Sequence, residues 1–77
     1  MDPKGDQVIE VLAKVSKKEK HTIKAEHELA ADLSIDSPKG LQLLTELEER
    51  FKIEIADEDA ARMVTVGDVV NFVIAKG

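Results

Sequence analysis

Apolar residues recur every three or four positions in separate segments of this chain, and that spacing is the strongest constraint on its fold. Residues three and four apart share one face of an α-helix, whereas a half-buried strand alternates apolar and polar residues. The first such segment follows Asp2-Pro3 and ends in a run of lysines. Asp2 can cap a helix there, and Pro3 suits the first helical position. The apolar residues of this first predicted helix are Val8, Val11, Leu12 and Val15.

The best-marked helix start lies near the middle of the chain. Asp36 or Ser37 can cap it, and Pro38 then occupies the first turn, where its missing N–H costs little. This second helix is predicted to run from Pro38 to about Phe51. Its predicted apolar stripe is Leu41, Leu44, Leu47 and Phe51.

Two more helices are predicted after residue 56. Asp57 or Glu58 can start a short third helix that continues to Met63. Thr65 then opens a fourth helix with Asp68 three residues later, which is a near capping box with Asp in place of the usual Glu. The apolar face of this last helix is Val66, Val69, Val70 and Val73.

The apolar residues among residues 21–36 follow neither helical nor strand spacing throughout. We therefore expect a long packed loop there, with a short helical turn around residues 26–32. Such a loop is unusual in a small domain unless it is functional or well anchored. Ile53 and Ile55 should lie in an extended connector. The sequence therefore predicts an all-α four-helix bundle in a single domain of residues 1–77, with three longer helices, one short helix and a long loop between helices one and two. The scattered apolar anchors of the loop are Ile23, Leu29, Leu33 and Ile35.

Composition excludes several classes of function. A chain of 77 residues leaves little material for a deep catalytic cleft, and no cysteine is present to form a disulfide or a thiolate metal site. The net charge is −5, and residues 26–59 hold eleven acidic residues against three basic ones, which opposes contact with nucleic acid and favours partners with basic surfaces. Neither a signal peptide nor a membrane span is expected, so we predict a cytoplasmic location. We also expect a monomer. The early lysines are read as a solvated surface, and they are Lys14, Lys17, Lys18, Lys20 and Lys24.

Metal and catalytic sites are also disfavoured. Asp57, Asp59 and Asp68 fall at calcium-loop positions one, three and twelve, but Arg62 stands where that loop requires glycine. His21 and His27 lack further ligands for zinc. No Gly-x-Ser-x-Gly elbow surrounds any serine, and we expect neither a metal site nor a catalytic residue.

Ser37 stands out because it joins the long loop to the second helix. A hydroxyl there would be exposed at the positive end of a helix dipole, where the negative charge of a phosphodiester is favoured. Taken alone, however, a serine at a helix start is more often an N-cap.

The order of motifs around Ser37 adds a second line of argument. The series is LSIDS at residues 33–37, LEERF at 47–51, IEIADED at 53–59 and VTVGD at 64–68. In this order and over nearly the whole chain, it resembles the acyl carrier protein family. The resemblance implies an acyl-carrier-like bundle that is not an enzyme, in which a phosphopantetheinyl transferase attaches 4′-phosphopantetheine to Ser37. The arm would carry acyl thioesters to acyl-transferring or synthase enzymes of fatty acid, polyketide or related lipid biosynthesis.

The resemblance also implies roles for other residues. Asp36 would help to engage the transferase and its metal. Partner enzymes with basic docking patches would recognise Asp36 together with Glu46, Glu48 and Glu49. The positions that would shelter an acyl chain are Leu33, Leu44, Leu47, Phe51, Ile55, Ala60, Met63, Val69, Phe72 and Val73.

The chain departs from the family pattern just after the serine. Pro38 replaces a large apolar residue, Lys39 an acidic residue, and Gln42 stands where an acid is common. Gly40 should cost the helix roughly 1 kcal/mol relative to alanine. Two alternatives remain beside the acyl carrier: a carrier of aminoacyl or D-alanyl groups on the same arm, and an unmodified interaction subunit in which Ser37 only caps the helix.

Overall fold

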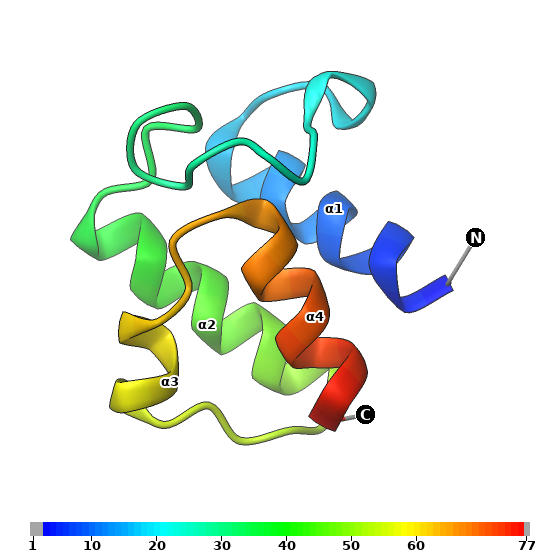
Figure 1. Ribbon diagram of the computed structural model, residues 1–77, viewed down its shortest axis with the longest axis vertical. Helices are drawn as coiled ribbons and strands as arrows, with labels where there is room; N and C mark the ends of the chain where they lie inside the picture. The colour runs from blue at the N-terminus through cyan, green and yellow to red at the C-terminus, as the bar shows by residue number, and fades with distance from the viewer. Residues whose placement is uncertain (1–2, 77) are drawn as a thin grey trace.

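Four α-helices and one short 3₁₀-helix form the regular structure of residues 3–76, which are the residues that this computed structural model describes (Figure 1). The predicted all-α fold is confirmed, since the described residues contain no strand, only an isolated antiparallel bridge between Glu28 and Thr65. The predicted cap Asp2 lies outside the described residues. The elements are α1 Pro3–Ser16, the 3₁₀-helix Lys20–Thr22, α2 Ser37–Phe51, α3 Asp57–Ala61 and α4 Val66–Lys76.

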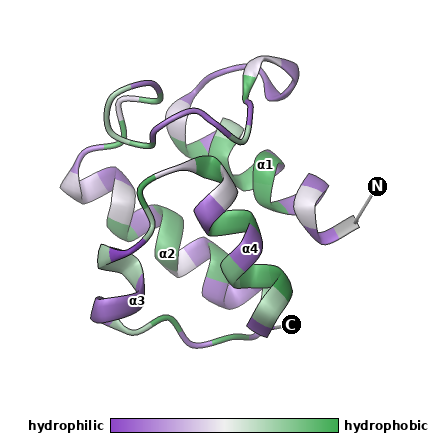
Figure 2. Ribbon diagram, viewed as in Figure 1, coloured by the Kyte–Doolittle hydropathy of each residue, from purple (hydrophilic) through white to green (hydrophobic). Residues whose placement is uncertain are grey.

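The core lies where α1, α2 and α4 meet. In Figure 2 the hydrophobic colour runs through the middle of these three helices. α3 contributes no buried residue, so its place depends on the segments that flank it. The buried apolar residues are Val8, Val11, Leu12, Val15, Ile23, Leu33, Ile35, Leu43, Leu47, Val66, Val69 and Val73.

The buried stripe of α2 differs from the predicted one. Leu43 and Leu47 are its buried residues, whereas Leu41 is 67% exposed and Leu44 is half-buried. Leu41, Leu44 and Leu47 satisfy helical spacing, but so do Leu43 and Leu47, and only the position of α1 selects between these faces. The prediction for Leu41 was therefore wrong.

The long loop is anchored as predicted, and it contains a short 3₁₀-helix in addition to the predicted turn. Ile23, Leu33 and Ile35 are buried, and Leu29 packs against the core. The 3₁₀-helix at Lys20–Thr22 was not predicted. Within the predicted turn around residues 26–32, the Asp32 N–H donates to the Glu28 carbonyl at 2.9 Å, which is a single helical turn. There the chain forms only hydrogen-bonded turns and does not continue as a helix.

The loop is joined to the start of α4 by backbone hydrogen bonds. The Val66 N–H donates to the His27 carbonyl at 2.9 Å, and the Gly67 N–H donates to the Ala25 carbonyl at 2.9 Å. These bonds satisfy donors in the first turn of α4, which have no partner within the helix. In the other direction, the Leu29 N–H donates to the carbonyl of Val64 at 2.9 Å. The loop thus reaches across the molecule and covers one side of the α3–α4 connection.

The predicted capping box of the fourth helix is present. The Thr65 Oγ1 accepts from the Asp68 N–H at 3.2 Å, and the Asp68 carboxylate accepts from the Thr65 N–H at 3.0 Å. The same carboxylate oxygen also accepts from the Val64 N–H at 3.0 Å. Local chemistry therefore sets where α4 begins.

Candidate functional site

Ser37 is the first residue of α2, and its side chain is exposed. Asp36, rather than Ser37, caps the helix: its Oδ1 accepts from the Lys39 N–H at 3.1 Å. The Asp36 carbonyl meanwhile accepts from the Gly40 N–H at 2.7 Å. Since a carboxylate already performs the capping, the helix start does not depend on the hydroxyl of Ser37.

Two of the backbone positions at this helix start offer no free N–H to an anion. Pro38 has no N–H, and the N–H of Lys39 is bound by the side chain of Asp36. The favourable position of a negative charge on Ser37 therefore rests more on the helix dipole than on free backbone donors.

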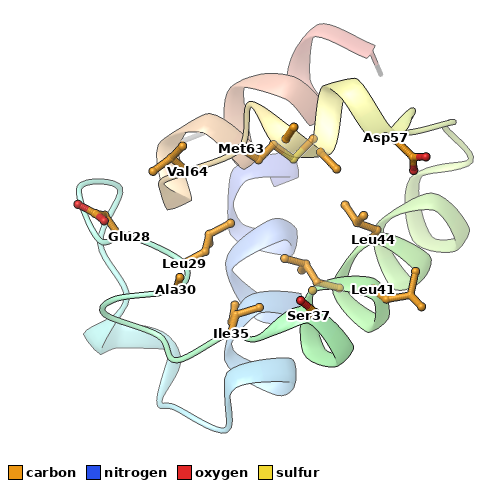
Figure 3. Close-up of a pocket in the computed structure, with 14 residues that line it drawn as sticks. Glu28, Leu29, Ala30, Ile35, Ser37, Leu41, Leu44, Asp57, Met63 and Val64 are labelled. Atoms are coloured by element: carbon orange, nitrogen blue, oxygen red, sulfur yellow. The ribbon is translucent and has the colours of Figure 1, made fainter.

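Ser37 adjoins a cavity of about 600 Å³ that is partly open to solvent. Figure 3 shows Leu29 from the long loop, Leu44 from α2 and Met63 after α3 directed into this space. Glu28 points away from it at the rim. Eleven of its fourteen lining residues are apolar or glycine, so the cavity suits an uncharged apolar group. The lining residues are Glu28, Leu29, Ala30, Ile35, Ser37, Gly40, Leu41, Leu43, Leu44, Asp57, Ala60, Ala61, Met63 and Val64.

Only part of the predicted acyl-sheltering set lines this cavity. Leu44, Ala60 and Met63 do. Phe72 lies on α4, with the Lys76 Nζ 5.7 Å from its ring centroid. The others lie in the core or pack against it, and they are Leu33, Leu47, Phe51, Ile55, Val69 and Val73.

The cavity therefore shares only three residues with the predicted set, and Ser37 itself belongs to its lining. Its loop residues, such as Leu29 and Ile35, follow no periodic pattern, and only their apolar character singled them out in the sequence.

Besides Asp36, two more of the predicted recognition acids make contacts within the fold. Glu46 accepts from the Lys14 Nζ at 2.7 Å, which links α2 to α1. The Glu48 carboxylate accepts from the Ile55 N–H at 3.0 Å and so ties the connector to the last turns of α2. Glu49 is exposed on the same helix. A partner that approaches α2 would thus meet carboxylates that differ in their freedom to reorient.

Lys20 and Arg50 both contact Glu10, each at 3.3 Å. The hydrogen bond from Lys20, with a further contribution from Arg50, holds the pKa of Glu10 below its usual value. This carboxylate connects α1 both to the long loop and to the end of α2.

No group of three or more His, Asp or Glu side chains within residues 3–76 is arranged to hold a metal ion. Over the same residues, every helix is too short or too polar to cross a membrane.

Comparison with known proteins identifies the kind of site. The sequence profile of the phosphopantetheine attachment site matches residues 6–73, which include Ser37 and every residue that lines the cavity. The helical bundle and this match define a carrier domain with a phosphopantetheine attachment site.

The relatives give the family. An acyl carrier protein of Wolinella succinogenes is 38% identical over 68 residues, covering 88% of this chain and 90% of that protein. One from an Exiguobacterium species is 39% identical over 69 residues, covering 90% and 87% of the two chains. This chain belongs to the acyl carrier protein family, which confirms the resemblance seen in its motifs.

Solved structures agree with this assignment. A chain assigned as an acyl carrier protein of Mycobacterium tuberculosis superposes with a TM-score of 0.88 at 35% identity, covering 94% of this chain and 96% of that one. The acyl carrier protein of Enterococcus faecalis gives a TM-score of 0.70 at 33% identity, with coverage of 88% and 95%.

Proposed function

We propose that this chain carries acyl groups as thioesters on a 4′-phosphopantetheine arm attached to Ser37, and is not itself an enzyme. The observation that carries the proposal is the exposed hydroxyl of Ser37, which stands at the start of α2 beside an apolar cavity. Asp36 caps the helix, so a substituent on the Ser37 oxygen would leave the cap in place.

The attachment site fits the chemistry of the proposed group. In the transfer, the Ser37 oxygen would form a P–O bond to the phosphate of phosphopantetheine as the pyrophosphate bond of coenzyme A breaks. Adenosine 3′,5′-bisphosphate would leave, and the serine proton would pass to the phosphopantetheinyl transferase. 4′-Phosphopantetheine would supply a terminal thiol for thioester formation, which this cysteine-free chain lacks.

The lining of the cavity supports an acyl cargo over an aminoacyl or D-alanyl cargo. Transfer of an alkyl chain from water into such an apolar site is favourable. A charged ammonium group would instead lose hydration there, and Glu28 and Asp57, its nearest opposite charges, are both exposed at the rim.

Acyl carrier proteins act together with synthase and transferase enzymes, and we propose partners of fatty acid, polyketide or related lipid biosynthesis for this chain. Basic patches on those enzymes would meet the acidic side chains at the start of α2 and along it, chiefly Asp36 and Glu49, which are exposed. Lys39 places a positive charge in the same region and would change which enzymes dock well.

The proposal takes residues 1–77 as one carrier domain that acts as a monomer in the cytoplasm. In its support, the buried apolar residues of the described chain form one continuous cluster.

Intact-mass measurement tests the attachment. The purified apo protein is incubated with coenzyme A, magnesium and a transferase of broad specificity. We expect the mass to increase by one phosphopantetheinyl group in the wild type and to stay unchanged in Ser37→Ala. If the wild type is not modified while a reference acyl carrier protein is, the proposal fails and the unmodified interaction subunit is favoured.

Ser34→Ala is the matched control because Ser34 is an exposed serine three residues from Ser37. It should be modified like the wild type. The mass of the species loaded in native cells would then show whether the cargo is acyl or aminoacyl.

A further inference from the structure

Gly40 lies one turn after Ser37 on the wall of the cavity. Ser37, Gly40 and Leu44 all line the cavity, and their spacing of three and four residues places them on one face of α2. Gly40 is therefore the position of α2 next to Ser37 on the cavity wall, where the arm attached to Ser37 would turn to deliver the acyl chain at its end into the cavity.

The backbone does not require glycine at this position. Gly40 does not have a positive φ, and its N–H makes an ordinary helical bond to the Asp36 carbonyl at 2.7 Å. A Cβ atom built there would lie 3.9 Å from the Ile35 Cγ2, which is a normal van der Waals distance. Glycine nevertheless weakens a helix relative to alanine, so this residue has a cost that the fold does not explain.

Gly67 shows what a structurally required glycine looks like in the same molecule. A Cβ atom there would lie 3.3 Å from the Ala25 carbonyl oxygen, where the long loop meets α4. The close approach of two backbones accounts for Gly67, and Gly40 has no comparable neighbour.

The consequence of Gly40 for the cavity is space beside Ser37. A side chain at position 40 would extend toward Ile35, which lines the same cavity, and would narrow the part of the cavity next to the attachment point. Beyond this point the walls are apolar, with Leu29 and Met63 directed inward (Figure 3).

We propose that Gly40 is a specificity-determining residue that keeps open a passage from Ser37 into the cavity, so that uncharged apolar acyl chains are sheltered there. This inference rests on the proposed function of Ser37. In this view, the absence of a side chain at Gly40 determines whether longer acyl chains enter the cavity. The acidic residues proposed to bind partner enzymes have no part in this selection.

Thermal unfolding of loaded proteins tests this role. Wild type, Gly40→Ala and Gly40→Leu are modified with phosphopantetheine alone, or with acetyl or decanoyl phosphopantetheine from the corresponding coenzyme A thioesters. A chain that binds the folded state but not the unfolded state raises the unfolding temperature. We expect decanoyl loading to raise the wild-type Tm by at least about 4 °C over the acetyl form. This increment should shrink in Gly40→Ala and vanish in Gly40→Leu.

Gln42→Leu is the matched control, since it adds the same side chain to an exposed position of α2 that does not line the cavity. It should keep the full decanoyl increment. An undiminished increment in Gly40→Leu, or no increment in wild type, would overturn the role of Gly40.

Intact mass separates this failure from failure of the proposed function. If no arm is attached to wild type, both the proposed function and the role of Gly40 are refuted. If the arm is attached normally but decanoyl loading still raises the Tm of Gly40→Leu by the full amount, only the role of Gly40 is refuted. Gly40→Ala guards against misfolding, because its methyl group fits at 3.9 Å from Ile35.

Discussion

Asp36 shows how much one side chain can decide at the scale of a residue. Its carboxylate caps α2 through the Lys39 N–H and so leaves the neighbouring hydroxyl of Ser37 available for modification. The resemblance to acyl carrier proteins implies that Asp36 would also help to bind the transferase, and we propose that this role depends on its charge. Capping requires only an oxygen acceptor, so the two roles can be separated.

We predict that Asp36→Ala lowers the free energy of unfolding by about 1 kcal/mol, because the first turn of α2 loses its cap. Asp36→Asn retains an oxygen acceptor and should be nearly as stable as wild type. If the carboxylate engages the transferase, Asp36→Asn will nevertheless be modified more slowly. Urea unfolding and the initial rate of phosphopantetheine transfer measure the two effects. Equal transfer rates for wild type and Asp36→Asn would show that the transferase does not depend on the charge of Asp36.

At the scale of elements, α4 begins where a local motif and a distant loop meet. Asp68 and Thr65 form the capping box, while the carbonyls of Ala25 and His27 bind the following N–H groups. The pKa of Asp68 is held below its ordinary value of 3.8, chiefly by the hydrogen bond from the Thr65 backbone N–H and then by the one from the Val64 backbone N–H. The charged form of Asp68 is therefore the one that the folded chain favours.

This depressed pKa predicts a pH dependence of stability with a definite sign. A carboxyl group whose pKa is lower in the folded chain stabilises the fold above its unfolded-state pKa. The contribution is lost as the pH falls through the folded-state pKa. Asn cannot take up a proton in this pH range. We therefore expect Asp68→Asn to lose less stability than wild type as the pH falls from about 5 to below 3.8, the ordinary pKa of an aspartate. Urea unfolding over this range measures the difference, and parallel curves for the two proteins would contradict the prediction.

At the scale of the whole molecule, α1, α2 and α4 share one core, and α3 stands outside it as a wall of the cavity. The buried face of α2 is set by Leu43 and Leu47, and the half-buried Leu44 faces the cavity. The same helix thus serves the core on one side and the cavity on the other. Small folds leave little excess stability, so the division between these faces has large consequences.

Two leucines on α2 should respond very differently to truncation. Leu47→Ala removes a fully buried side chain from the core and should cost about 2–5 kcal/mol of unfolding free energy. Leu41→Ala removes a side chain that is 67% exposed and should cost less than about 1 kcal/mol. Denaturant unfolding of both variants measures the contrast. Similar losses in the two variants would mean that α2 is rotated from the orientation described.

Much of the architecture follows from the sequence because its causes are local. Caps and turns act over a few residues, so Asp36 with Pro38 and Thr65 with Asp68 mark two helix starts without knowledge of the rest of the chain. Ser37 could be singled out in the same way, from its place before a helix and from the order of the surrounding motifs.

Only the tertiary structure decided which faces and segments meet. Helical spacing permitted either Leu41 or Leu43 to be buried, and the packing of α1 against α2 selected Leu43. The long loop has no period, so its attachment to α4 and the entry of Leu29 into the cavity wall were not predictable. Both depend on contacts between residues far apart in the chain, which no local rule of propensity, capping or spacing contains.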